Sequence, residues 1–220
     1  MSGDADQYVA DGMVASDARL AAADALRRLG HALVSHDPGD EFFERVVTAI
    51  DSVLPEITAS APRRRLAGNM KRSMYDDPPR DGSRIDHFPD CVISGHANPL
   101  GVAMMVHREG DEAVARITLG PAFEGAPGRA HGGIVAGIFD DVLGNVLVII
   151  EQPAFTAELT VHYLAPTPLG VELEYRGRLT GREDRKLWID GECRGPDGAL
   201  VATASGLFIA IDMAKLMGSG

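Results

Sequence analysis

The sequence predicts an α+β fold, in which an antiparallel sheet of about six strands wraps around one long central helix and follows an N-terminal helical extension. Two observations predict it. Residues 1–80 carry apolar side chains at helical spacing, whereas residues 85–213 carry strand-like segments on both sides of a single helical stretch. The connections between the later strands are too short for parallel crossovers, so the sheet should be antiparallel.

Composition indicates a globular protein with an acidic surface. Apolar residues make up 45% and charged residues 24% of the 220 residues, which is an ordinary balance for a chain able to bury a core. The net charge of -11 argues against a general nucleic-acid-binding protein, although a few local cations can still bind a phosphate-bearing ligand. Cys91 and Cys193 are far apart and lack metal-site spacing, so we expect two reduced thiols, no disulfide and no metal site.

The hydropathy of the sequence indicates neither a signal peptide nor a membrane-spanning segment. Residues 1–7 are polar and acidic, unlike a signal peptide, and the longest apolar stretch, residues 142–150, is too short to cross a bilayer. We therefore expect a cytoplasmic protein with no membrane segment.

The N-terminal extension is predicted to form a helical hairpin. Apolar positions recur at helical spacing over residues 16–34 and again over 42–54, with a Pro/Gly-containing turn between them. Pro55 should end the second helix. A third short helix is expected over residues 66–74, and the turn-forming residues 76–83 mark a boundary.

The second part of the chain is predicted to contain two strands, one helix and four more strands. The helix should begin at Gly132 and run to about Leu147. The segment 155–163 alternates, and we expect Thr156 on the polar face of that strand and Tyr163 on the apolar face. The six predicted strands cover residues 102–108, 113–119, 155–163, 171–180, 186–194 and 199–211.

One face of the predicted helix is nearly bare of side chains. It collects Gly133, Gly137, Asp140 and Gly144, while the opposite side is a wide apolar arc. Glycine inside a helix costs about 1 kcal/mol relative to alanine, so close approach of a backbone or a ligand should be the reason for it. Asp140 on this face is the best candidate for chemistry; the alternative is an ordinary exposed helix acid.

The run from His131 to Asp140 resembles the HGG-x6-D signature of hotdog-fold acyl-CoA thioesterases, in the branch related to the phenylacetic-acid-pathway enzymes. The lead-in 124–130, the strand 156–163 with its Pro-rich turn, and the end 197–208 are similar to that family too. The resemblance covers about residues 91–211. It implies a hotdog fold, hydrolysis of acyl-CoA thioesters, and coenzyme A only as part of the substrate, with no separate cofactor and no metal.

The resemblance also implies roles for single residues. The Gly133 N–H would stabilise the oxyanion, Asp140 would act as general base or as nucleophile, and Thr156 would position the attacking water. His131 is interpreted mainly as a residue that holds the loop, with a catalytic role as the alternative. Some branches carry Asn where this chain has Gly125, so that contribution is absent or replaced.

The spacing of the two main groups predicts an assembly. Asp140 lies seven residues after Gly133, about 10 Å along a helix, whereas both groups must come within about 3 Å of the reacting atoms. Two antiparallel copies related by a two-fold axis can meet this requirement. We therefore expect a homodimer with two shared sites, alone or as a dimer of dimers.

Binding of the CoA phosphates requires local cations in this acidic protein. Arg182, Arg185 and Lys186 in a predicted hairpin are the first candidates, with a plain polar hairpin tip as the alternative reading. Arg129 and Gly132, beside the HGG turn, are the second candidates for substrate binding.

Three other readings stay open. The chain could bind acyl-CoA without hydrolysing it, or it could act on acyl-carrier-protein thioesters. A hotdog hydratase or dehydratase is disfavoured, because the candidate acid is in mid-helix rather than paired with a histidine on an overhanging segment. The acyl chain is not legible from the sequence.

Overall fold

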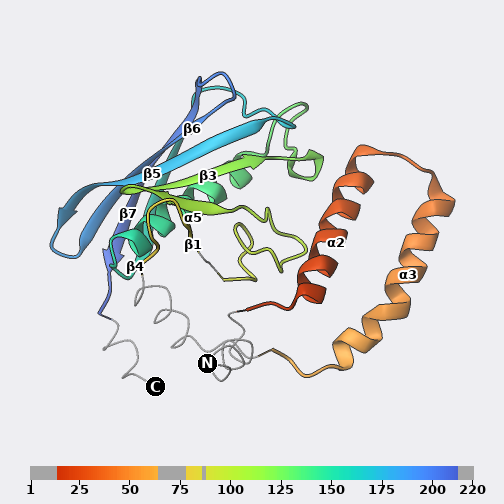
Figure 1. Ribbon diagram of the computed structural model, residues 1–220. Helices are drawn as coiled ribbons and strands as arrows, with labels where there is room; N and C mark the ends of the chain where they lie inside the picture. The colour runs from red at the N-terminus through yellow and green to blue at the C-terminus, as the bar shows by residue number, and fades with distance from the viewer. Residues whose placement is uncertain (1–13, 64–77, 86–87, 213–220) are drawn as a thin grey trace.

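The computed structural model describes residues 14–63, 78–85 and 88–212. A single antiparallel sheet curves around a long helix, and a helical hairpin stands beside it, with α3 on the far side of α2 from the sheet (Figure 1). This is the predicted α+β arrangement. The elements are α2 (Asp17–Ser35), α3 (Asp40–Ala59), β1 (Arg84–Ile85), β2 (Val106–Glu109), β3 (Glu112–Thr118), η1 (Pro121–Phe123), α5 (Gly132–Ile149), β4 (Ala154–Tyr163), β5 (Glu172–Glu183), β6 (Lys186–Arg194) and β7 (Leu200–Ala210).

The two edge strands of the sheet differ greatly in length. The order is β1-β2-β3-β5-β6-β7-β4, and all neighbouring pairs are antiparallel. At one edge β1 has only two residues, whereas at the other edge β4 has ten. The chain leaves α5 directly into β4, so this long edge strand lies next to the helix that it follows.

The core lies between α5 and the inner face of the sheet. Val135, Phe139, Val142 and Leu143 of α5 are fully buried, and Phe139 packs edge-to-face on Tyr175 with 5.1 Å between ring centroids. Full burial of such side chains stabilises by about 1.5–3 kcal/mol each. By length and composition α5 could cross a membrane, but the enclosing sheet gives it the surroundings of a core helix.

Two predicted boundaries are wrong for identifiable reasons. α3 continues through Pro55 to Ala59: proline removes only the N–H that would bond the Asp51 carbonyl, and at the end of the helix the Ser60 hydroxyl donates to the Glu56 carbonyl (3.1 Å), which belongs to the last turn. Residues 102–105 do not form a strand, because Ala103 adopts φ +57° and interrupts the extended run. The helix expected over 66–74 lies outside the described residues. The division at residues 80–85 stays a prediction.

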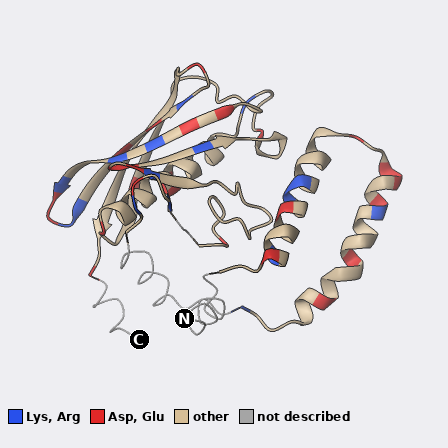
Figure 2. Ribbon diagram, in the orientation of Figure 1, with Lys and Arg blue, Asp and Glu red and all other residues tan. Residues whose placement is uncertain are grey.

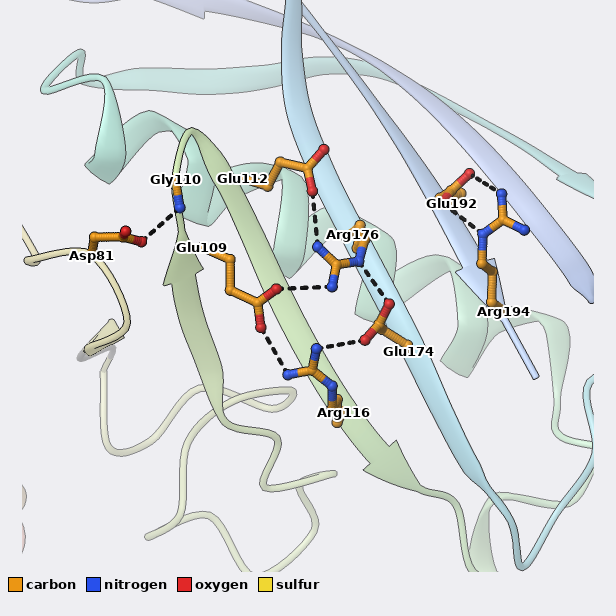
Figure 3. Close-up of polar contacts among 9 residues, drawn as sticks. All are labelled: Asp81, Glu109, Gly110, Glu112, Arg116, Glu174, Arg176, Glu192 and Arg194. Carbon is orange, nitrogen blue, oxygen red and sulfur yellow. Dashed lines mark hydrogen bonds and ion pairs between the residues drawn. The ribbon is translucent and has the colours of Figure 1, made fainter. Parts of the chain in front are cut away.

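An ionic cluster spans the outer face of β2, β3 and β5 (Figure 3). Arg176 donates to Glu174 (2.6 Å), Glu109 (2.8 Å) and Glu112 (3.0 Å), and Arg116 pairs with Glu109 (2.9 Å) and Glu174 (2.6 Å). Hydrogen bonds from Arg116 first and from Arg176 hold the pKa of Glu109 below its usual range, and the same two arginines lower the pKa of Glu174.

We expect Arg176→Met to lower the free energy of unfolding by about 1 kcal/mol at neutral pH, because it leaves three carboxylates without their shared partner. Both glutamates have folded-state pKa values below 4.5. Their contribution is therefore present above 4.5 and is lost as pH falls through the lowered values, so the difference from wild type should shrink in acid. Urea unfolding of both proteins at neutral pH and in acid measures this difference in the free energy of unfolding. Arg178→Met, on the same strand and with no ion pair among the described residues, is the matched control; an equal loss in both variants would contradict the cluster's role.

Candidate functional site

The first turn of α5 is capped by the histidine that precedes it. His131 Nδ1 accepts the Gly133 N–H at 2.9 Å, and the His131 carbonyl accepts the N–H of Ile134 at 2.9 Å. The His131 N–H donates in turn to the Phe123 carbonyl (2.8 Å). The ring therefore holds the turn as a hydrogen-bond acceptor. The Gly133 N–H, which is predicted to stabilise an oxyanion, is thus already hydrogen-bonded to the His131 ring. A substrate oxygen would have to share or displace that bond.

The glycine face of α5 is covered in its middle, which corrects the expectation of a bare face. A Cβ on Gly137 would lie 2.9 Å from Ile93 Cδ1, so Gly137 admits a loop of the same chain rather than a partner. A Cβ on Gly133 would meet only the His131 ring, and one on Gly144 would meet nothing within 4 Å. The face is therefore covered by the loop at Gly137 but not at Gly133 or Gly144.

Asp140 and Asp141, adjacent in sequence, occupy different environments. Asp140 is exposed, and the Thr156 hydroxyl donates to its Oδ1 at 2.9 Å. Asp141 is half-buried and accepts from the Cys91 thiol at 3.4 Å. The structure therefore brings together Asp140 and Thr156, two of the predicted site residues, and it places Asp141 under the loop that also covers Gly137.

A β-bulge in β4 makes the contact between Thr156 and Asp140 possible. The register of β4 against β7 shifts between Thr156 and Glu158, so Thr156 pairs with Phe208 while Leu159 pairs with Gly206. Phe208 is buried in the core, so Thr156 faces α5 on the same side as Leu159. The predicted unbroken alternation, with Thr156 on the face opposite Leu159, is wrong here because Ala157 is the extra residue of the bulge.

Tyr163 is a site residue that the sequence did not single out. Its hydroxyl donates to the Gly132 carbonyl at 2.8 Å, and both residues line a hollow of about 380 Å³ together with Arg129 and Thr167. The only signal was a hydroxyl at the end of the inward row of β4, which reads equally well as an apolar core position. Arg129 and Gly132, the second candidates for substrate binding, thus lie beside one another at the start of α5.

The first candidates for phosphate binding lie at the other end of α5. Arg182 donates to Gln152 Oε1 (2.9 Å), just beyond the last turn of α5, and Arg185 donates to the Ala210 carbonyl (3.0 Å). Lys186 is exposed at the start of β6. All three residues belong to the hairpin between β5 and β6, and Figure 2 shows basic residues at the end of the sheet that is remote from α2 and α3. Because α5 has 18 residues, about 27 Å, one chain cannot bring this hairpin to its own HGG turn.

Gly125, where some branches carry Asn, is packed against the HGG turn. A Cβ at this position would lie 2.8 Å from the His131 Cα, so a larger residue requires the loop to move. The described residues hold no group of three or more His, Cys, Asp or Glu side chains able to bind a metal ion.

The curated proteins to which the chain is similar include several acyl-coenzyme A thioesterases. The chain is 36% identical over 93 residues to the acyl-coenzyme A thioesterase THEM4 of Xenopus laevis, covering 42% of each protein. It is 32% identical over 124 residues to THEM4 of Bos taurus, covering 55% of this chain and 51% of that protein. The chain thus spans about half the length of these curated relatives or less. No family model matches it.

Among solved structures, the crystal structure of a thioesterase superfamily protein superposes with a TM-score of 0.75 and 28% identity, covering 89% of this chain and 92% of that one. The match extends well beyond the sheet and α5. It confirms the predicted hotdog arrangement of an antiparallel sheet around a central helix. In fold and over about half of its sequence, the chain is thus similar to hotdog-fold acyl-CoA thioesterases.

Proposed function

We propose that this protein hydrolyses acyl-CoA thioesters to a free acid and CoA. The observation that carries the proposal is the exposed Asp140 carboxylate, oriented by the Thr156 hydroxyl at 2.9 Å on the helix whose first turn bears the glycine pair. The names of the curated relatives support the same reaction.

The hydrogen bond from Thr156 gives Asp140 a defined orientation. It occupies Oδ1, which leaves Oδ2 to accept a proton from water or to attack the thioester carbon. In the first route a hydroxide equivalent adds to the carbonyl; in the second an anhydride forms and water opens it. In both routes the thiolate of CoA leaves and takes up a proton.

The developing oxyanion is stabilised by the first turn of an α5 helix. The Gly133 N–H and the positive end of the helix dipole point out of that turn, and glycine lets an oxygen approach closely. His131 releases or shares this N–H when substrate binds, so the ring keeps the donor oriented until then.

The site is completed by a second copy of the chain. Asp140 and Gly133 of one α5 are about 10 Å apart, too far to act on one carbonyl. β4 offers a ten-residue edge on which Phe155 and Tyr163 are each 52% exposed, the kind of edge that pairs with another strand. Antiparallel pairing of two β4 edges lays the α5 helices side by side in opposite directions, so Asp140 faces Gly133 of the partner subunit.

The same pairing resolves the separation of the basic residues. With the two helices antiparallel, the Arg182, Arg185 and Lys186 hairpin of one copy approaches the Arg129 side of the other. We propose that the phosphates of CoA are held between them, so that both groups of cations serve one site. The dimer, or a dimer of such dimers, is then the working unit, and the cytoplasm supplies its acyl-CoA.

Asp140→Asn should lower kcat on acyl-CoA substrates by about 10²- to 10⁴-fold, because the amide cannot act as base or nucleophile. A panel of acyl-CoAs with a free-thiol readout measures turnover, and calorimetry measures binding, which should persist. Glu151→Gln, an exposed acid just beyond the same helix, is the control. If wild type binds acyl-CoA but hydrolyses none of the panel, the protein is a binder; hydrolysis only of carrier-protein thioesters would redirect the substrate assignment.

Sharing of the site is testable by mixing two inactive variants. Asp140→Asn keeps the N–H donor, and Gly133→Pro removes that N–H at a first-turn position where proline is tolerated. Refolded mixtures should recover activity, up to about half that of wild type per heterodimer, because one of its two sites is intact. Size-exclusion chromatography checks that dimers form. Mixtures as inactive as the separate variants would show that both groups act within one chain.

The hydroxyl of Thr156 should matter more than its shape. Thr156→Val keeps the volume but removes the donor to Asp140, and the lost bond of about 0.5–1.5 kcal/mol predicts a fall in kcat of up to about tenfold. Thr156→Ser keeps the donor and should stay within about threefold of wild type. Steady-state kinetics on the best acyl-CoA compares them, and equal rates for Val and Thr would remove Thr156 from the mechanism.

A further inference from the structure

Helix α2 contacts the segment that leads into the HGG turn. His31 Nδ1 accepts the Ala122 N–H at 3.0 Å, and the His31 ring packs edge-to-face on Phe123 with 5.1 Å between centroids. The approach is close enough to restrict the neighbouring sequence, since a Cβ on Gly120 would lie 2.7 Å from His31 Nδ1. His31, which lies 91 positions before Ala122 in the sequence, thus packs closely against η1 and the glycine that precedes it.

A short run of hydrogen bonds continues from η1 to the candidate site. The Phe123 carbonyl accepts the His131 N–H at 2.8 Å, and the His131 ring accepts the Gly133 N–H at 2.9 Å. The position of η1 therefore determines where His131 begins and how its ring meets Gly133. Ala122 and Phe123, the two residues that His31 touches, are the ones from which this run starts.

The rest of α2 is held by polar contacts to a second segment over α5. Arg27 donates to the carbonyls of His96 and Asn98, both at 2.9 Å, and Arg19 forms an ion pair with Asp90. Ala23 is the one buried residue among those described in α2. With so little apolar burial, α2 contributes little to the core. Its hydrogen bonds and ion pair, rather than a buried apolar area, determine its position.

We propose that His31 is a positioning residue for the thioesterase site: it holds η1 so that His131 and the Gly133 N–H keep the orientation that an oxyanion requires. This inference rests on the proposed function and gives the helical hairpin a role in that same site. His31 touches no reacting atom and acts through η1.

The ring must be neutral to accept a hydrogen bond at Nδ1, with its proton on Nε2. Burial and the neighbouring Arg27 lower the pKa of His31, which favours this neutral form. The chemistry of the contact is therefore consistent with a steady acceptor rather than a proton carrier.

Two substitutions separate the hydrogen bond from the ring. His31→Phe keeps an aromatic ring against Phe123 but removes the acceptor, whereas His31→Asn offers an amide oxygen near the Nδ1 position. We expect kcat to fall up to about tenfold in the Phe variant, with KM changing less than about threefold, and to recover mostly in the Asn variant. Gly120→Ala, which displaces the ring from the other side, should reproduce the loss. Arg28→Gln, on the same helix and paired only with Asp24 among the described residues, is the control.

Amide hydrogen exchange on the full-length protein gives a readout independent of activity. His31→Phe should speed exchange at Ala122 and over residues 131–133, with a Tm close to that of wild type. Wild type that hydrolyses no acyl-CoA would overturn the proposed function alone, because exchange still decides the role of His31. Unchanged exchange overturns the positioning role, as does an Asn variant that behaves like Phe, or a loss explained entirely by a lowered Tm.

Discussion

Val135, Phe139, Val142 and Leu143 fill the inside of the curved sheet, and everything at the candidate site follows from their burial. A helix gripped along this whole face cannot rotate or slide without opening the core, because close-packed interiors resist such shifts. Gly177 and Gly191 bring the strands close, since a Cβ on either would lie 2.9 Å from Leu143 Cδ2. The candidate site is thus built on a helix that is packed into the core, which holds Asp140 and the HGG turn on one axis.

The fixed position of α5 also fixes the distance between Asp140 and Gly133. Two groups on one helix keep their separation, so Asp140 and the Gly133 N–H, the proposed oxyanion donor, cannot converge by any local motion. The chain carries the means to overcome this at its surface: β4 is a long edge next to the helix, and its bulge turns Thr156 toward Asp140. The same strand also ends in Tyr163, which holds the Gly132 carbonyl. One strand therefore contacts both Asp140 and the first turn of α5, and it is also the edge at which we propose that a second copy pairs.

Periodicity in the sequence was sufficient for the elements but not for their irregularities. The apolar arc predicted α5 to within two residues, and β6 was predicted at its observed bounds, because buried faces impose a strict repeat. The bulge at Ala157 inserts one residue without changing composition, so alternation placed Thr156 on the wrong face. Gly137 was expected to face a ligand or partner, but the loop residue Ile93 fills that space, and a loop contact has no period to read. Tyr163 and His31 were missed for the same reason: their partners, Gly132 and Ala122, lie 31 and 91 residues away in sequence.

The contrast between α5 and α2 explains why a polar contact is the suitable link between the extension and the site. Helix α2 buries only Ala23 among its described residues, and such a small apolar contact is non-directional, so it does not by itself set the orientation of η1. A hydrogen bond weakens steeply once its angle departs from linear, so the Ala122 N–H fixes the turn of η1 as well as its distance from α2. The bonds from Phe123 to His131 and from His131 to Gly133 are directional too. A run of such bonds transmits orientation, which is the property that an oxyanion donor must have, whereas the buried face of α5 supplies the fixed axis against which that orientation is set.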